Sequence, residues 1–437
     1  MSLKFKKEIS HKIMKVDEQF TQKQISYKPV LATLPGIGLG MPRGGIPQPT
    51  LAQPTIFKTP LAPIPIPGEN LSRAINYYAD YGGCGFWRMY WPEHYLNANQ
   101  KALVNGISTM ILEPRFYSDL KAVKLQRQAT PVQLQFMKFL KAASQEFGFK
   151  IIYEIDDIVF RDDIPDYNRC KVAFVNPEIV ESIMAMMQIA DEITVTCKSM
   201  RDYYVEKTGN KNVTIIPNYA PRAWIDRYYN PERILELFDK NSKRPRIGYC
   251  GSGTHIDQLN KTGMKDDFEF VIDHIISTRS KYKWVFFGCH PLQVMPFIKS
   301  GEMEFYGWEK IYDFPRKIND LELQAVIAPL QNNVFNCAKS NIKYLEAAYL
   351  GIPGVFQDLP PYEMTPLRFT TGDEMLDQLN VLLEDYEDYS LKARKYADTM
   401  FLDDEPNLMK HYEVYFTPYG SSDRKYLLES NENNTTK

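Results

Sequence analysis

From residue 73 onward the chain alternates between two patterns of apolar and polar residues. Short apolar runs of the kind that form buried strands are separated by stretches in which apolar residues return every three or four positions, the period of an amphipathic helix. The clearest helix is predicted over residues 132–147, and Gly148 is placed to end it. A β-rich run at residues 150–155 follows and ends in acidic residues. The same reasoning predicts strands at residues 74–78, 193–196 and 213–217 and helices at residues 180–190 and 199–207.

The alternation of strand and helix patterns begins again after a polar stretch at residues 222–244. Strands alternating with helices form parallel sheets that are covered on both faces. The predicted fold is therefore α/β, with two Rossmann-like, doubly wound domains that face each other across a cleft. Ligands of such sheets bind beyond the carboxyl ends of the strands, so the turns that follow the strands should line this cleft. In this half the predicted strands are residues 246–251, 283–288, 303–307, 325–330 and 354–357, with a helix at 340–350 that Gly351 closes.

Composition divides the chain into five segments. Residues 28–67 contain ten of the 29 prolines, which excludes helices and central strands and predicts an extended arm. Residues 1–70 carry nine Lys/Arg against four Asp/Glu, so the arm is either a solvated leader or a segment that contacts a polyanion. The predicted segments are a basic Pro/Gly-rich arm (1–72), a first Rossmann-like domain (73–235), a second (236–395), a helix returning to the first domain (396–420) and a disordered tail (421–437).

Charge and cysteine content exclude several classes of protein. The chain has 437 residues, and its 52 basic and 54 acidic side chains leave a net charge of −2, which argues against binding to nucleic acid or membrane by bulk charge alone. No apolar run approaches the roughly 20 residues of a membrane span, and no secretory signal is expected. The six cysteines are far apart, without the spacing of a zinc site or a disulfide framework, so we expect a cytoplasmic protein.

The most informative chemistry lies at the start of the predicted helix 340–350. Ser340 is a good N-cap, and Lys339, Lys343 and Glu346 share one face at spacings of four and three residues. Free backbone N–H groups, the helix dipole and two lysines suit a phosphate. A carboxylate one turn further along can accept hydrogen bonds from two sugar hydroxyls, as in a nucleoside diphosphate. The alternative is an exposed helix with an incidental Lys343–Glu346 pair.

Two glycine-rich turns follow predicted strands. Residues 251–255, Gly-Ser-Gly-Thr-His, permit close approach of backbone to phosphate, and two hydroxyls add donors. The alternative is a tight turn with a structural His255. In the first half, Gly82, Gly83 and Gly85 form the matching turn, and Arg88 is either a partner for phosphate or part of a surface ion pair.

Asp156 and Asp157 follow a predicted buried strand and point toward the expected cleft. A carboxylate there can deprotonate an acceptor hydroxyl or stabilise positive charge on a reacting sugar carbon. Helix capping is the structural alternative. The adjacent pair lacks the spacing of a metal-binding DxD motif, so no metal is expected.

The chain resembles the GT-B glycosyltransferases of the family-4 type over residues 73–415. The resemblance is carried by Pro217-Asn218 after a strand, the restart at 246–255, and the run from Lys339-Ser340 through Glu346 to Gly351-Ile352-Pro353. It implies a nucleotide-sugar donor, with UDP favoured over GDP or ADP, and no other cofactor. It departs from the family where a first glutamate would fall at Ala338, which leaves the donor sugar open. The implied donor contacts are Gly251, Ser252, Gly253, Thr254, His255, Lys339, Ser340, Asn341, Lys343 and Glu346.

The first domain should hold the acceptor, near Gly82, Gly83, Gly85, Arg88, Asp156 and Asp157. Residues 115–150 carry seven Lys/Arg against two Asp/Glu, which is compatible with a polyanion or with solvated helix faces. The chain is also similar to T4-like bacteriophage glycosyltransferases that place glucose or arabinose on 5-hydroxymethylcytosine. That likeness implies double-stranded DNA as a partner, base flipping and action in the host cytoplasm. The alternatives are a surface polysaccharide or lipid-linked glycan as acceptor, a sugar-nucleotide epimerase, and a non-catalytic nucleic-acid- or glycan-binding module.

Overall fold

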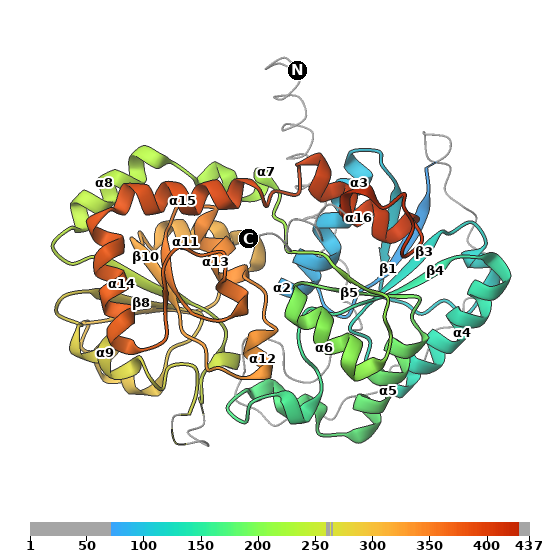
Figure 1. The fold of residues 1–437 in the computed structure, drawn as a ribbon, viewed down its shortest axis with the longest axis horizontal. Helices are drawn as coiled ribbons and strands as arrows, with labels where there is room; N and C mark the ends of the chain where they lie inside the picture. The colour runs from blue at the N-terminus through green and yellow to red at the C-terminus, as the bar shows by residue number, and fades with distance from the viewer. Residues whose placement is uncertain (1–70, 259–262, 264, 428–437) are drawn as a thin grey trace, which may run out of the picture. The chain divides into compact units, whose positions relative to one another are not determined.

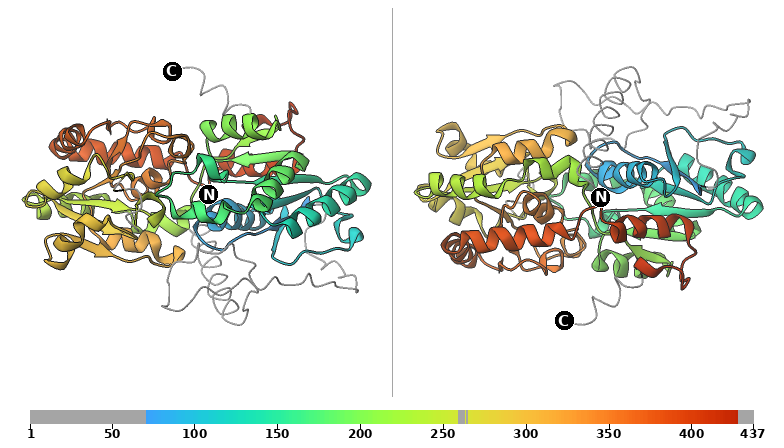
Figure 2. Two further views of the ribbon diagram at one scale, coloured as in Figure 1. Left: turned by 90° about the horizontal axis from the view of Figure 1, so that it is seen from below. Right: turned by 90° about the horizontal axis from the view of Figure 1, so that it is seen from above.

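The computed structural model describes residues 71–258, 263 and 265–427, which contain two parallel sheets of six strands each (Figure 1). Both sheets belong to the same compact unit of the chain. Helices cover both faces of each sheet, as Figure 2 shows. The prediction of two doubly wound α/β sheets is confirmed. The predicted arm at 1–72 falls almost wholly outside the described residues, and the five segment boundaries stay predictions.

The first sheet has the strand order β2-β1-β3-β4-β5-β6, and every pairing in it is parallel. Its strands are β1 (Arg73–Tyr77), β2 (Leu103–Ile107), β3 (Ala122–Gln126), β4 (Lys150–Glu154), β5 (Glu192–Val195) and β6 (Val213–Ile215). The helices that precede β7 are α2 (Gly83–Gly85), α3 (Trp91–Ala98), α4 (Pro131–Phe147), α5 (Pro177–Ile189), α6 (Lys198–Thr208), α7 (Arg222–Ile225) and α8 (Pro231–Asn241).

The second sheet has the order β12-β11-β10-β7-β8-β9, again parallel throughout. Its strands are β7 (Arg246–Cys250), β8 (Lys283–Phe287), β9 (Glu304–Tyr306), β10 (Ala325–Ala328), β11 (Gly354–Gln357) and β12 (Arg368–Phe369). The helices that follow β7 are α9 (Ile272–Ser277), α10 (Met295–Lys299), α11 (Phe314–Asp320), α12 (Val334–Cys337), α13 (Ile342–Ala348), α14 (Gly372–Glu384), α15 (Tyr386–Asp398) and α16 (Glu405–Phe416).

Local sequence explains the best-predicted element, α4. Thr130 and Gln133 form a capping box, in which the threonine hydroxyl accepts from the Gln133 backbone and the Gln133 side chain accepts from the Thr130 backbone. Gly148 ends the helix in the left-handed conformation, at φ 77°. Start and stop signals therefore lie within the segment itself, and the predicted helix at 132–147 is confirmed.

The predicted helix at 340–350 is wrong in extent. The structure has two short helices instead, α12 and α13, separated by residues 338–341. Asn341 holds the N-cap position of α13 without a side-chain hydrogen bond, so the prediction that Ser340 caps the helix is also wrong. The Ser340 hydroxyl accepts from the Asn218 side chain at 3.1 Å, and this bond from the other half replaces capping. A helix of seven residues also gives weaker support to the dipole argument for a phosphate.

The end of the described chain returns to the first half. In Figure 1, α16 (red) lies beside α3, and the two helices are in contact. Beyond it, the buried Arg424 makes an ion pair with Glu192 on β5. Within the predicted tail at 421–437, Arg424 and Leu427 are buried. No helix among the residues described is both long and apolar enough to cross a membrane.

Candidate active site

The glycine turn after β7 and the lysine on α13 meet, as the sequence predicts. Both lie beyond the carboxyl ends of strands in the second sheet. A Cβ atom built on Gly251 would come within 2.9 Å of the Lys343 Nζ and within 2.5 Å of the Tyr249 hydroxyl. The backbone at Gly251 therefore lies close to the ammonium group, and only glycine fits there without a shift of these side chains.

Lys343 is a poorly solvated cation. Its Nζ donates to the Tyr249 hydroxyl at 3.1 Å and lies 4.5 Å from the centre of the same ring. Burial lowers the pKa of Lys343 to about 8, and the charge of Asp267 opposes this shift. The side chain is thus charged at neutral pH, and its hydrogen-bond partner is a neutral hydroxyl. Such a group gains more from an incoming anion than a solvated lysine does.

Glu346 lies on the same helix and is half-buried. Burial raises the pKa of this carboxyl to about 8, and the Lys343 charge opposes the shift. At pH 7 most Glu346 side chains are therefore protonated. A neutral carboxyl can donate one hydrogen bond and accept others, which suits a pair of adjacent sugar hydroxyls.

The rest of the glycine turn is fixed by its own side chains. The Ser252 and Thr254 hydroxyls lie 2.6 Å apart and bond to each other, and the Thr254 N–H donates to the Ser252 hydroxyl. Gly253 and His255 are buried in the 3₁₀ turn Gly253–His255. The His255 Nδ1 lies 2.7 Å from Asp267, while burial lowers the pKa of this histidine to about 4. His255 is therefore neutral at pH 7 and held in place by a carboxylate.

Asp267 is a buried centre that sequence reasoning missed. Besides meeting His255, its carboxylate accepts from the Tyr167 hydroxyl at 2.7 Å, from the Asn336 side chain at 2.7 Å and from the Gln331 N–H at 2.8 Å. Tyr167 belongs to the first half, so one carboxylate ties the glycine turn, residues 331–336 and the first half together. No local signal marks this residue, since its partners lie between 12 and 100 positions away.

Lys339 also joins the two halves. Its Nζ donates to both carboxylate oxygens of Asp157, at 2.9 and 2.8 Å. The Cys197 thiol lies 3.5 Å from the Ala338 carbonyl oxygen, beside this pair. Asn341 turns elsewhere, because its side chain donates to the Tyr396 hydroxyl on α15 at 2.7 Å. The structure thus brings Asp157 and Lys339 together, although the sequence placed them in separate donor and acceptor groups.

Asp156 belongs to a second network. Arg127 lies 3.4 Å from it, and the Cys84 thiol bonds to it. Burial raises the pKa of Asp156, while Arg127 opposes the shift. Arg127 itself has φ 40°, a strained conformation of the kind that gathers at functional sites, and it also pairs with Asp80 at 2.7 Å.

The glycines of the first half build a short helix start and not an open turn. The Asp80 carboxylate accepts from the N–H groups of Gly82 and Gly85 at 2.8 and 3.1 Å. A Cβ on Gly85 would lie 1.9 Å from the Asp80 carbonyl oxygen, so this glycine is required by packing. Gly83 has open space around it.

Arg88 has no exposed face for a phosphate. It is buried, and its guanidinium donates to Glu154 at 2.7 Å, to the Ile216 carbonyl at 2.5 Å and to the Asn218 side chain at 3.1 Å. Burial raises the pKa of Glu154, but Arg88 and Lys124 outweigh it and the net shift is downward. These contacts contradict both readings of Arg88 made from the sequence, because the ion pair is internal and the guanidinium is fully engaged.

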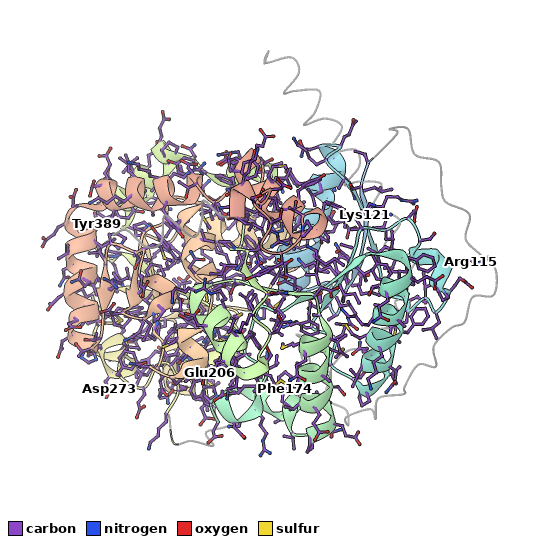
Figure 3. The ribbon with its side chains drawn as sticks, turned by 45° about the vertical axis from the view of Figure 1, so that its right-hand side comes forward. Arg115, Lys121, Phe174, Glu206, Asp273 and Tyr389 are labelled. Atoms are coloured by element: carbon purple, nitrogen blue, oxygen red, sulfur yellow. The ribbon has the colours of Figure 1, made fainter. Side chains whose placement is uncertain are left out.

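The basic segment at residues 115–150 is largely neutralised. Lys124 pairs with Glu154, Lys141 with Asp191 and Lys150 with Glu192, besides the pairs of Arg127. The exposed cations of this segment are Arg115, Lys121 and Lys138. Figure 3 shows Arg115 at the outer edge of the first half. Within the residues that the structure describes, no cluster of acids, histidines and cysteines could hold a metal ion.

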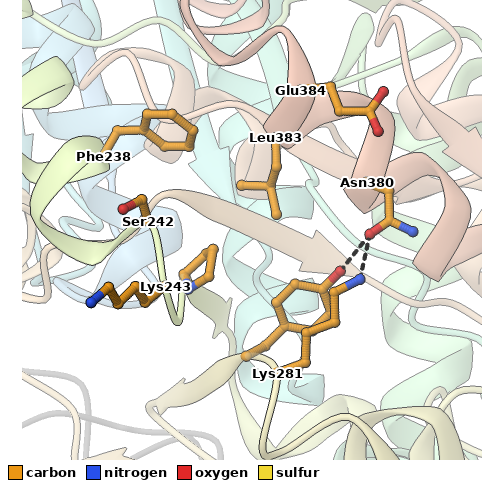
Figure 4. A pocket seen from close by; sticks show the side chains of 9 residues that line it. Phe238, Ser242, Lys243, Lys281, Asn380, Leu383 and Glu384 are labelled. Atoms are coloured by element: carbon orange, nitrogen blue, oxygen red, sulfur yellow. Dashed lines mark hydrogen bonds between the residues drawn. The ribbon is translucent and has the colours of Figure 1, made fainter.

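A surface pocket of about 270 Å³ lies elsewhere in the second half (Figure 4). Residues just before β7 and β8 line it, so it sits at the amino ends of these strands, away from Gly251. Lys281 and Tyr282 share the side-chain oxygen of Asn380 in its wall. The predicted ligand site therefore does not coincide with this pocket. Its lining consists of Phe238, Ser242, Lys243, Pro245, Lys281, Tyr282, Asn380, Leu383 and Glu384.

Three crystal structures of the Anabaena protein Alr3699/HepE are similar to this structure. They show HepE in complex with UDP, with UDP and glucose, and with UDP-glucose, at TM-scores of 0.52, 0.50 and 0.52 and sequence identities of 11%, 12% and 11%. Each comparison covers 79% of this chain and 99% of HepE. No protein-family model and no curated protein matches the sequence. The shared architecture confirms the GT-B fold of two Rossmann-like sheets that the sequence resemblance implies.

Proposed function

We propose that this protein is a glycosyltransferase that moves a sugar from a nucleoside diphosphate, with UDP favoured, to a hydroxyl acceptor. The observation that carries the proposal is Lys343, a half-buried cation beside the backbone of Gly251 beyond the carboxyl ends of a parallel sheet. This is where doubly wound sheets bind ligands. The HepE complexes with UDP and UDP-glucose support the choice of nucleotide.

In this proposal the second half binds the donor. Lys339 and Lys343 neutralise the diphosphate, and the glycine turn offers it the backbone N–H groups of Ser252 and Gly253, since those of Gly251, Thr254 and His255 donate within the protein. Glu346 bonds the ribose hydroxyls. His255 is neutral and acts by holding the turn against Asp267.

The reaction breaks the bond between the anomeric carbon and the diphosphate oxygen, and the electron pair leaves with UDP. The acceptor oxygen forms the new bond to the anomeric carbon and loses its proton to a carboxylate or to the leaving phosphate. Asp157 is the better-placed carboxylate, because Asp156 is held between Arg127 and Cys84. These residues can accelerate the reaction mainly by stabilising the leaving diphosphate with fixed cations.

The acceptor in this proposal is 5-hydroxymethylcytosine in phage DNA, with glucose or arabinose transferred in the host cytoplasm. The likeness of the sequence to T4-like bacteriophage glycosyltransferases supports this acceptor. The base hydroxymethyl group would be the nucleophile, and a duplex would need to present it by base flipping.

A panel of radiolabelled nucleotide sugars tests donor and acceptor together. The purified protein is incubated with each sugar and with two DNA duplexes that differ only in carrying 5-hydroxymethylcytosine or cytosine. Label in the modified duplex alone supports the proposal. Transfer to a lipid or glycan instead would overturn the DNA acceptor. Release of UDP from a UDP-sugar without acceptor would reject a non-catalytic binding module.

A further inference from the structure

Lys339, which the proposed function assigns to the donor diphosphate, already forms an ion pair with Asp157. The ammonium group gives two bonds to the two oxygens of Asp157. Its Nζ also lies 4.0 Å from the centre of the Phe335 ring. The side chains of Lys339 and Asp157 are 16% and 33% exposed, so the pair is only partly screened by water.

A diphosphate cannot use Lys339 fully while this pair persists. A lysine ammonium has three protons, and the carboxylate engages it on one side while the aromatic ring covers another. The diphosphate carries more negative charge than a carboxylate, so its oxygens compete with Asp157 for the Lys339 ammonium group.

We infer that the donor diphosphate displaces Asp157 from Lys339, and that this exchange frees the Asp157 carboxylate for the acceptor hydroxyl. The inference rests on the proposed function and adds an order of events, in which the donor binds first and Asp157 then becomes available as the base. Asp157 is then both a competitor of the donor and a participant in transfer.

Other contacts keep the two halves joined during such an exchange. The Asn218 side chain still bonds the Ser340 hydroxyl, and the Tyr167 hydroxyl still bonds Asp267. Asp157 also has a local anchor, since its Oδ1 accepts from the Ile158 N–H at 3.0 Å. The exchange therefore needs only a rotation of two side chains.

Calorimetric titration of UDP into the wild type and Asp157→Asn tests the inference. An asparagine keeps an oxygen for the Ile158 N–H but loses the charge that holds Lys339. We expect UDP to bind Asp157→Asn about 2- to 5-fold more tightly, the range for a partly exposed ion pair. Uridine lacks phosphate, so its affinity should stay the same. Asp163→Asn, which breaks an ion pair with Lys207 inside the first half, is the matched control and should not change UDP affinity.

A double-mutant cycle shows whether the effect passes through Lys339. In a Lys339→Met background, Asp157→Asn should no longer raise UDP affinity. An unchanged or weaker affinity of Asp157→Asn in the wild-type background would overturn the inference, as would an equal gain with uridine. A wild-type protein that does not bind UDP would instead overturn the proposed function, so the two failures are distinguishable.

Discussion

Replacing Lys343 by methionine should strengthen the fold and weaken nucleotide binding. Methionine has a similar length and leaves no cavity. The lowering of the Lys343 pKa from 10.5 to about 8 corresponds to roughly 3 kcal/mol of lost stability, which partial exposure of the side chain reduces to about 1–2 kcal/mol. Loss of a charged hydrogen bond to phosphate should raise the Kd for UDP about 10- to 150-fold.

The pH dependence of this stability change has a defined sign. The folded protein binds the Lys343 proton less tightly than the unfolded chain, so the cost is complete below pH 8 and disappears as the pH rises toward 10.5. Urea unfolding at pH 7 and pH 10.5 should therefore show Lys343→Met more stable than the wild type at the lower pH only. Lys281→Met, which replaces an exposed lysine bonded to Asn380, is the control and should change neither property. A destabilised Lys343→Met variant with normal UDP affinity would refute the reasoning.

Three further substitutions test other parts of the site. Glu346→Ala should raise the KM for a UDP-sugar about 3- to 10-fold at pH 7, because the Glu346 carboxyl is mostly neutral there. 2′,3′-Dideoxy-UDP lacks the ribose hydroxyls, so its Kd should be nearly the same for Glu346→Ala and the wild type. Gly251→Ala places a methyl group against Lys343 and should weaken UDP binding about 10-fold or more. Gly83→Ala places its methyl group in open space and should not change UDP affinity. Equal UDP affinities of the two variants would contradict the role of the Gly251–His255 turn. Arg88→Met should lower the free energy of unfolding by about 3–5 kcal/mol in urea, because it removes the partner of a buried carboxylate, and near-wild-type stability would contradict the structural role.

The sequence predicts those features whose causes lie within a few residues. The helix α4 carries its capping box and its terminal glycine in one segment. The approach of Gly251 to Lys343 follows from topology, because Gly251 directly follows β7, and α13 follows β10, the neighbour of β7 in the same parallel sheet, with only α12 between them. These parts of the fold and site need no knowledge of distant contacts.

The features that the sequence misses depend on partners far along the chain. Ser340 does not cap a helix because Asn218, 122 positions away, donates to its hydroxyl. Arg88 is drawn into the interior by Glu154, 66 positions away. Asp267 gains its role from Tyr167 in the other half. Tertiary hydrogen bonds and buried charge outweigh local propensity at each of these residues.

A crystal structure with UDP tests the central claim most directly, namely that the diphosphate binds between the Gly251–His255 turn and Lys343. We expect phosphate oxygens within hydrogen-bond distance of the Lys343 Nζ and of backbone N–H groups in that turn. UDP bound at another place, such as the pocket beside Lys281, would contradict it, and so would a site without nucleotide at saturating UDP.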